Sequence, residues 1–349
     1  MTTTPAPTRR LLLHMGAPKT GSSLLQSFFA RNVGELAARG IAYPALEPLE
    51  GALGNEATSG NGALLARALM PPRHRVALSE AERAAALERL DAALADATGD
   101  VLVSSEWFFV IPKLEQERLA ERALRHGLRL CPIVYLRRQD DMIMSLYAQE
   151  VKKAGLTEDA ATFCMHYAQK DRRLNYYAVL QGLTTRFPAE DCRVRIYERA
   201  QWVNGSLIDD FLAACGVEDL SGFDRRVEKI NVTPGRLALE WMRLANALPA
   251  RTPAAERLMR ALRRLDGRED SPGPVLPPRL RLEILERFAG SNARAAREFL
   301  GRSDGRLFLT PPPAPDEPWQ DIATLARGRM ISGLASAIRG VDALFARKG

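Results

Sequence analysis

The stretch of sequence that decides the fold lies near the N-terminus and reads LLLHMGAPKTGSS, from Leu11 to Ser23. Its first residues, 11–14, form a short apolar run that predicts a buried strand, and helical spacing of apolar residues follows the stretch. A turn that contains Gly16 and Gly21 joins the two. A strand that passes through such a turn into a helix favours an α/β fold with a parallel sheet.

The rest of the chain repeats this alternation of strand and helix. Further buried strands are predicted at 101–103, 132–136 and 193–197, and helices at 79–97, 114–127, 140–153 and 205–215. The pattern predicts an α/β class with three layers around a central parallel sheet of four or five strands, followed by a mainly helical C-terminal part.

A chain of 349 residues is compatible with one domain, because nucleotide-binding α/β folds with insertions reach this length. We expect a disordered Thr/Pro-rich tail at 1–9 and a single domain at 10–349. Within it, 10–235 would form the α/β core and 236–349 the helical extension. The Gly-, Pro- and Asn-rich stretch 44–62 is expected to be a long loop of the kind that serves as a lid or binding segment.

The composition excludes several classes of protein. Hydrophobic residues make up 46% and charged residues 26%, which is ordinary for a globular protein and excludes bulk disorder. The net charge of +7 would suit a polyanion, but arginines alternate with acidic residues and no basic stripe carries aromatics, so we expect no nucleic-acid partner.

Apolar runs are too short for a signal peptide or a transmembrane segment, so a cytoplasmic protein is expected. The four cysteines lack zinc-type spacing, which predicts reduced thiols.

The turn at 16–23 has the sequence context of a phosphate-binding loop. Backbone N–H groups and the positive end of a helix bind phosphate where a glycine-bearing turn follows a strand. The two glycines have the spacing of a Walker A loop, but Ser22 follows Gly21 where a lysine is expected, and Lys19 lies inside the loop instead. The structural alternative is a plain turn in which Ser22 caps the helix.

A second segment, VYLRRQDDMIMSLY at 134–147, strengthens the phosphate interpretation. It predicts a strand that ends at Arg137 and a helix that carries Ser145 about two turns along. An arginine and a serine that face one crevice could hold a terminal phosphate by charge and hydrogen bond. That crevice would lie outside the carboxyl ends of the strands, where open α/β sheets bind ligands. Taken singly, Arg137 could be a surface ion-pair partner and Ser145 a tolerated helix serine.

The segments GAPKTGSS and YLRRQDDMIMSLY together resemble the 5′-phosphosulfate and 3′-phosphate motifs of the sulfotransferases that use 3′-phosphoadenosine-5′-phosphosulfate (PAPS). Segments near 101–109, 194–201 and 211–217 continue the resemblance, which covers 1–235 best. It implies a P-loop-like fold and an enzyme that transfers a sulfuryl group from PAPS to a hydroxyl or amine, leaving 3′-phosphoadenosine-5′-phosphate (PAP). The overall character of the chain suggests a glycan or small-metabolite acceptor. Because a sulfuryl group carries less charge than a phosphoryl group, no metal is expected.

The resemblance also implies roles for individual residues. It implies that the 5′-phosphosulfate is bound by Lys19, Thr20, Gly21, Ser22 and Ser23, and that Arg137 and Ser145 bind the 3′-phosphate. Asn231, in the turn before the helix at 236, would be a further nucleotide contact, although a helix cap explains that turn almost as well. Lys19 would neutralise the leaving phosphate during transfer.

An acceptor hydroxyl must lose its proton as it attacks sulfur, so a general base is required. Glu106 is the preferred candidate because it follows the strand at 101–103 and should emerge at the same sheet edge as Lys19 and Arg137. The alternative for Glu106 is a helix cap or an ion pair. His14 is a second candidate base, although a strand histidine beside a phosphate loop is more often packed and hydrogen-bonded.

Two other functions stay open at this point. An ATP-dependent P-loop kinase shares the turn architecture, but the chain lacks both a lysine after Gly21 and a convincing Mg²⁺-binding aspartate. A non-catalytic nucleotide- or glycan-binding protein would be indicated by a broken Lys19 or base position, and Lys19 is intact. Nothing identifies the acceptor further. A homodimer also stays open, because the apolar helical stretch 328–346 fits burial against the core or against a second subunit.

Overall fold

The computed structural model describes residues 9–47, 60–226, 235–247, 273–322 and 324. Their contacts divide them into two compact units, each of which is described by itself. The first unit comprises the described parts of 1–138, 175–231 and 289–311, and the second those of 139–174, 232–288 and 312–349. This grouping does not follow the predicted subdivision at residue 235, and the single domain remains a prediction.

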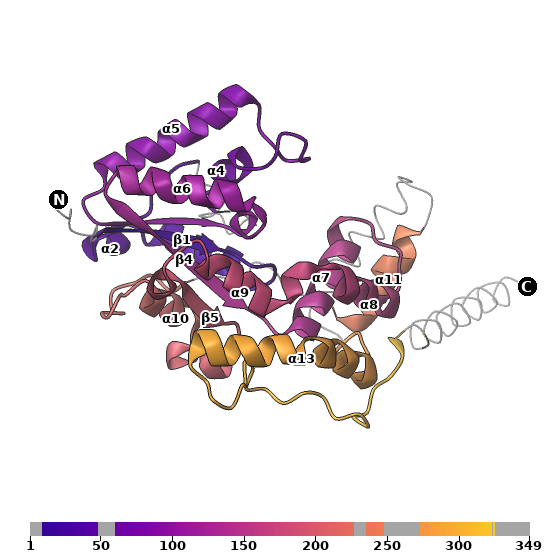
Figure 1. Ribbon diagram of the computed structural model, residues 1–349. Coiled ribbons are helices and arrows are strands. Elements are labelled where there is room, and N and C mark those ends of the chain that lie inside the picture. The colour runs from indigo at the N-terminus through magenta and orange to yellow at the C-terminus, as the bar shows by residue number, and fades with distance from the viewer. Residues whose placement is uncertain (1–8, 48–59, 227–234, 248–272, 323, 325–349) are drawn as a thin grey trace, which may run out of the picture. The chain divides into compact units, whose positions relative to one another are not determined.

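The first unit is built on a five-stranded sheet in which every neighbouring pair is parallel (Figure 1). The strand order is β2-β3-β1-β4-β5. The bounds are Arg9–Met15 for β1, Ile41–Ala42 for β2, Asp100–Ser105 for β3, Leu128–Leu136 for β4 and Arg193–Ile196 for β5. The predicted α/β class with a central parallel sheet is confirmed. The two-residue β2 is the strand that the sequence pattern did not predict.

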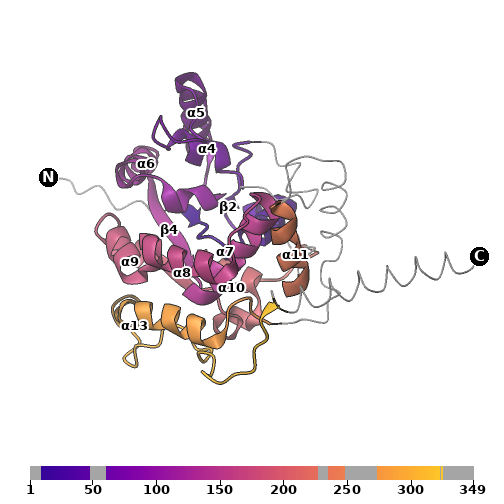
Figure 2. The same ribbon diagram turned by 90° about the vertical axis from the view of Figure 1, so that its right-hand side faces the viewer.

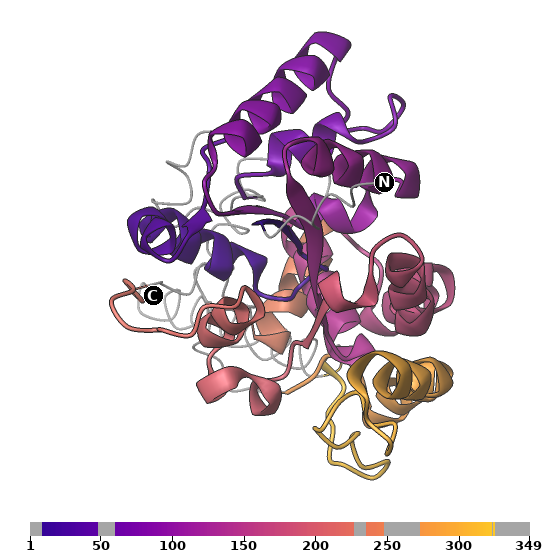
Figure 3. The same cartoon turned by 60° about the vertical axis from the view of Figure 1, so that its left-hand side comes forward.

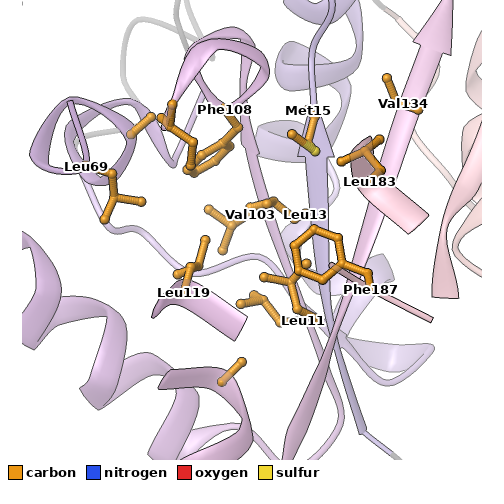
Figure 4. Close-up of a cluster of buried hydrophobic side chains, with 14 of the residues drawn as sticks. Leu11, Leu13, Met15, Leu69, Val103, Phe108, Leu119, Val134, Leu183 and Phe187 are labelled. Atoms are coloured by element: carbon orange, nitrogen blue, oxygen red, sulfur yellow. The ribbon is translucent and has the colours of Figure 1, made fainter. Parts of the chain in front are cut away.

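Alternate side chains of the strands enter two separate cores, one on each face of the sheet. From β1, Leu11 and Leu13 enter the first core, part of which Figure 4 shows, whereas Leu12 enters the second. Helices α4, α5, α6 and α9 contribute to the first core, and α1, α2 and α10 to the second. In Figure 3 the indigo α1 and α2 accordingly lie away from the purple α4, α5 and α6. The first unit therefore has three layers.

Four helices of the first unit, α1, α5, α6 and α10, agree with the predicted positions to within a few residues, whereas α2, α4 and α9 were not predicted from the sequence. Their bounds are Ser22–Arg31 for α1, Val33–Ala38 for α2, Ala63–Ala68 for α4, Glu80–Asp96 for α5, Lys113–Arg125 for α6, Tyr176–Thr184 for α9 and Leu207–Ala214 for α10. Of the predicted loop 44–62, residues 48–59 lie outside the described residues. At its end Gly62 donates its N–H to the carbonyl oxygen of Ser104 on β3, at 3.0 Å.

Strand β1 starts within the predicted tail 1–9. Arg9 is its first residue and pairs with Leu128 of β4. The Arg9 guanidinium donates to the carbonyl oxygens of Ala97 and His126, which hold this residue in place. Residues 1–8 lie outside the described residues, and the remainder of the tail stays a prediction.

The described part of the second unit contains helices joined by irregular segments and no strand. It contains α7 (Gln139–Lys153), α8 (Ala160–Lys170), α11 (Arg236–Asn246) and the first part of α13 (Pro278–Leu300), whose second part belongs to the first unit. Helices α7 and α11 lie side by side in Figures 1 and 2. Their apolar faces share a core with α8 and α13. Beside it, Arg281 of α13 forms an ion pair of 2.8 Å with the buried Asp140.

Candidate functional site

The carboxyl ends of three neighbouring strands in the first unit bring together the loop at 16–21, Glu106 and Arg137. Met15, the last residue of β1, pairs with Ser105, the last residue of β3. On its other side β1 pairs with β4, which continues to Leu136. The chain leaves β1 towards β2 and β3 but leaves β4 towards β5, so the strand order reverses here. Such a reversal is where open α/β sheets bind ligands.

The loop has a backbone that few residues adopt. Lys19 and Gly21 both have positive φ, 65° and 78°, on either side of the buried Thr20. The Thr20 hydroxyl donates to the carbonyl oxygen of Ala17 at 2.7 Å and closes the turn. Turns with left-handed residues orient successive N–H groups into a concavity that suits an anion.

Close packing leaves no room for a side chain at Gly16 or Gly21, the two glycines of the loop. A Cβ on Gly16 would lie 2.5 Å from Oγ of Ser22 and 3.1 Å from Cα of Glu106. A Cβ on Gly21 would lie 2.5 Å from a methyl group of Leu207 and 3.2 Å from the ring of Tyr197. The loop therefore lies directly against the start of α1 and against the residues that follow β3 and β5.

The N-terminus of α1, which follows the loop, has no side-chain cap. Gly21 occupies its N-cap position, no side chain caps it, and no acidic residue stands in its first turn. Ser22 is therefore the first residue of the helix and not its cap. Its hydroxyl is buried, the residue being 8% exposed, and has no hydrogen-bond partner among the described residues. A buried hydroxyl without a hydrogen-bond partner costs about 1–3 kcal/mol of free energy. A bound anion that accepts a hydrogen bond from Ser22 would remove this cost.

Arg137 is attached to the loop. Its Nη1 donates to the carbonyl oxygen of Lys19 at 2.7 Å, and its guanidinium lies 5.4 Å from the ring centroid of Tyr197. The hydroxyl of Tyr176 donates to the Arg137 backbone oxygen. The neighbouring Arg138 instead donates to the carbonyl oxygen of Pro311 at 3.0 Å. Arg137 therefore links the end of β4 to the loop.

Glu106 is the exposed first residue of a short 3₁₀ helix, η1 (Glu106–Val110). The side chain that caps this helix belongs to Ser105, whose hydroxyl accepts from the N–H of Trp107 at 3.2 Å. The alternative in which Glu106 caps the helix is therefore not observed. Glu106 combines exposure with closeness to Gly16, as a base at the site would require.

His14 lies on the buried side of the same edge. Its Nδ1 is 2.8 Å from the hydroxyl of Ser104, and its ring packs against Phe211 at a centroid distance of 4.9 Å. Burial lowers the pKa of His14 to about 3, so the imidazole is neutral near pH 7. Because it is 0% exposed, this geometry fits a packing role better than proton transfer to an acceptor.

Two predicted contacts are not placed at this site. Ser145 is half-buried on α7, in the second unit, so its pairing with Arg137 remains a prediction. Asn231 lies outside the described residues. Conversely, Tyr197 and Tyr176 contact Arg137 but were not predicted from the sequence. The position of Tyr197 at the end of the strand predicted at 193–197 was the available signal, because that strand ends at the same sheet edge.

Comparisons with known proteins add little to this geometry. No family model matches the chain, and no solved structure matches it. An uncharacterized protein of Archaeoglobus fulgidus is 32% identical over 181 residues, which cover 50% of this chain and 47% of that protein. The chain thus spans about half the length of this curated relative.

Neither a metal centre nor a membrane span is found in the described part of the chain. No group of three or more His, Cys, Asp or Glu side chains there could hold a metal ion. No helix in the described ranges is long and apolar enough to cross a membrane.

Proposed function

We propose that the chain is a PAPS-dependent sulfotransferase with a P-loop-like nucleotide site at the loop 16–23. The observation that carries the proposal is the buried, unpartnered hydroxyl of Ser22 at the open N-terminus of α1. A triphosphate-binding loop would carry the lysine at that position. Here the loop offers a hydroxyl there and a lysine three residues earlier, which suits the smaller charge of a phosphosulfate.

The residues of the loop would share the work of holding the donor. Backbone N–H groups at the start of α1 and the hydroxyls of Ser22 and Ser23 would bind the 5′-phosphosulfate oxygens. Lys19 would offset the charge that builds on the departing phosphate. Arg137, fixed against Lys19 and Tyr197, would bind the 3′-phosphate by charge, and Ser145 would add a hydrogen bond.

The transfer step itself is a displacement at sulfur. An acceptor oxygen or nitrogen attacks the sulfur atom, the bond between sulfur and the bridging oxygen breaks, and PAP leaves with the electron pair. The acceptor proton passes to the carboxylate of Glu106. The acceptor class that we propose is a glycan or a small metabolite with a hydroxyl or amine group.

A turnover assay over a panel of acceptors tests this proposal. PAP release from PAPS is measured with sugars, aryl alcohols and amines, in the presence of EDTA. We expect at least one acceptor to stimulate release, and Lys19→Ala to reduce it at least 100-fold, since removing one charged donor from such a site costs about 3–4 kcal/mol. The matched control is Lys113→Ala, at the first residue of α6. Full activity of Lys19→Ala would refute the mechanism, and activity only with Mg²⁺ and ATP would favour a kinase.

A further inference from the structure

The second unit contains a cavity of about 110 Å³. It lies between α7, the first turn of α8, α11 and the segments 275–277 and 319–322. For comparison, an engineered protein cavity of about 150 Å³ holds one benzene molecule. The cavity, which is partly open, therefore has room for the ring of a ligand with a single six-membered ring.

The charged side chains on α11 and at the N-cap of α8 that line the cavity already have partners. The Glu240 carboxylate accepts from Nε and Nη2 of Arg243 at 2.8 and 2.6 Å, and Nη1 of Arg243 donates to the Thr157 carbonyl oxygen. The Asp159 carboxylate accepts from the N–H and hydroxyl of Thr162 at 2.9 and 2.8 Å. These charged groups are satisfied within the protein.

The two remaining charged residues of the lining are also engaged. Arg236 donates to the carbonyl oxygens of Pro274 and Gln320 at 3.3 and 3.4 Å. Asp321 accepts a hydrogen bond of 2.6 Å from the hydroxyl of Thr324. The charged residues of the lining are of both signs, three acidic and two basic, so a charged ligand would lose its hydration and meet repulsion as well as attraction. The lining therefore favours a neutral ligand.

One polar group of the lining is different. The hydroxyl of Tyr147 forms no hydrogen bond within the part of the chain that the structure describes, although the residue is only 2% exposed. Burial, followed by the nearby Glu240 carboxylate, raises the pKa of Tyr147, so the hydroxyl stays protonated and can both donate and accept. Buried tyrosine hydroxyls usually have a partner. A ligand in the cavity would supply it.

Part of the cavity wall is apolar. It includes Leu239 and Leu276, which are 2% and 0% exposed, and the ring of Trp319. The indole N–H of Trp319 donates to the Pro274 carbonyl oxygen at 3.1 Å, which fixes the ring. An apolar ligand body would pack against this wall.

From these features we infer that the cavity binds a small neutral molecule that has one hydroxyl group on an apolar body, hydrogen-bonded to Tyr147. Phenol is the simplest probe of this class. The inference does not depend on the donor site in the first unit.

Titration calorimetry on the full chain tests it with phenol and with toluene, which has the same shape without the hydroxyl. We expect phenol to bind about fivefold more tightly, the equivalent of one net hydrogen bond. Tyr147→Phe should remove this preference and leave toluene binding unchanged. Tyr167→Phe, a matched substitution in the same unit outside the cavity lining, should keep it. Ala161→Phe, which fills the cavity, should weaken the binding of both probes at least tenfold.

Several results would overturn the inference. The first is equal affinity of the wild type for phenol and toluene, and the second is a preference for phenol that survives Tyr147→Phe. Tighter binding of benzoate or benzylamine than of phenol would contradict a neutral ligand. Phenol and toluene binding unaffected by Ala161→Phe would show that the probes do not enter the cavity. No phenol binding at concentrations up to about 10 mM would also overturn the inference. A dissociation constant of that size corresponds to a binding free energy of about −2.7 kcal/mol. Circular dichroism melts confirm that each variant is folded.

Discussion

Ser22 separates two interpretations of the loop at the scale of a single residue. Sequence alone allowed it to be a helix cap or a phosphate ligand. In the structure the N-cap is Gly21, and the Ser22 hydroxyl is buried beside Gly16 with no partner among the described residues. A cap would have used this hydroxyl internally. Its availability is what a ligand site requires, and it is the strongest single argument for an anion at this loop.

Gly21→Ala should weaken both the fold and the donor site. The φ of 78° costs an alanine about 1–2 kcal/mol, and the added Cβ would contact Leu207 at 2.5 Å. We expect a loss of about 2 kcal/mol in the free energy of unfolding by urea and at least tenfold weaker PAP binding. The control is Gly34→Ala in α2, where the Cβ would meet nothing within 4 Å. Equal stability of the two variants would contradict this account of the loop.

His14 should make the stability of the protein depend on pH. Its pKa is about 3 in the folded state against about 6.5 in the unfolded chain, so the unfolded state binds the extra proton between these values. The free energy of unfolding should be fully retained above pH 6.5 and fall as the pH drops towards 3, by about 2 kcal/mol from this group between pH 7 and pH 5. Urea unfolding at both pH values measures it.

The control for this prediction is the exposed His166. His14→Gln should abolish about 2 kcal/mol of the pH dependence, whatever its effect on stability at pH 7. His166→Gln removes one imidazole from an exposed position and serves as the matched variant for comparison. An unchanged pH dependence in His14→Gln would show that the imidazole is not buried as the structure has it.

At the scale of elements, the ends of β4 and β5 hold the segment 307–311 by opposite charges. Arg138, after β4, donates to the carbonyl oxygen of Pro311. Glu198, after β5, accepts from the N–H groups of Leu309 and Thr310 at 2.8 and 2.6 Å. Arg138 thus contacts this segment, whereas its neighbour Arg137 donates to Lys19 in the loop. The ends of both strands therefore anchor the segment 307–311.

Glu198→Gln should loosen this segment. Burial acts to raise the pKa of Glu198, but its hydrogen bonds together outweigh burial and lower the pKa, so the charged carboxylate is the form that holds the two N–H groups. Losing that charge should speed hydrogen exchange at Leu309 and Thr310 at least tenfold, which mass spectrometry of peptides covering 305–312 detects. The matched control is Glu190→Gln at an exposed position. Exchange at the wild-type rate would mean that the carboxylate does not anchor the segment.

The elements themselves could largely be predicted from the sequence. The strands β1, β3 and β4 are buried on both faces and therefore read as continuous apolar runs. The two-residue β2 leaves no such run. Side-chain direction after a strand was harder, because Arg137 and Arg138 are adjacent and chemically alike. Only their tertiary partners, Lys19 and Pro311, distinguish them.

At the scale of the whole molecule, the sequence pattern predicted one nucleotide-binding core with a helical extension, whereas contacts group the described residues differently. Helices α7 and α8 belong to the second unit with α11, although they lie between strands of the sheet in the sequence. Such grouping depends on packing between segments far apart in the chain, which periodicity does not encode. The cavity around Tyr147 depends on the same long-range packing and left no signal in the sequence.

The central claim is that the loop 16–23 and Arg137 bind the donor nucleotide. Titration calorimetry with PAP, and with ATP plus Mg²⁺ as the competing ligand, tests it most directly on the wild type, Arg137→Ala and Arg125→Ala. Arg125 is an exposed arginine at the end of α6, near the amino end of β4, and its variant changes net charge equally. We predict that PAP binds the wild type and Arg125→Ala with equal affinity. It should bind Arg137→Ala at least 20-fold more weakly, which corresponds to a loss of about 1.8 kcal/mol in binding free energy. Binding of ATP with Mg²⁺ in place of PAP, or PAP binding indifferent to Arg137, would contradict the claim.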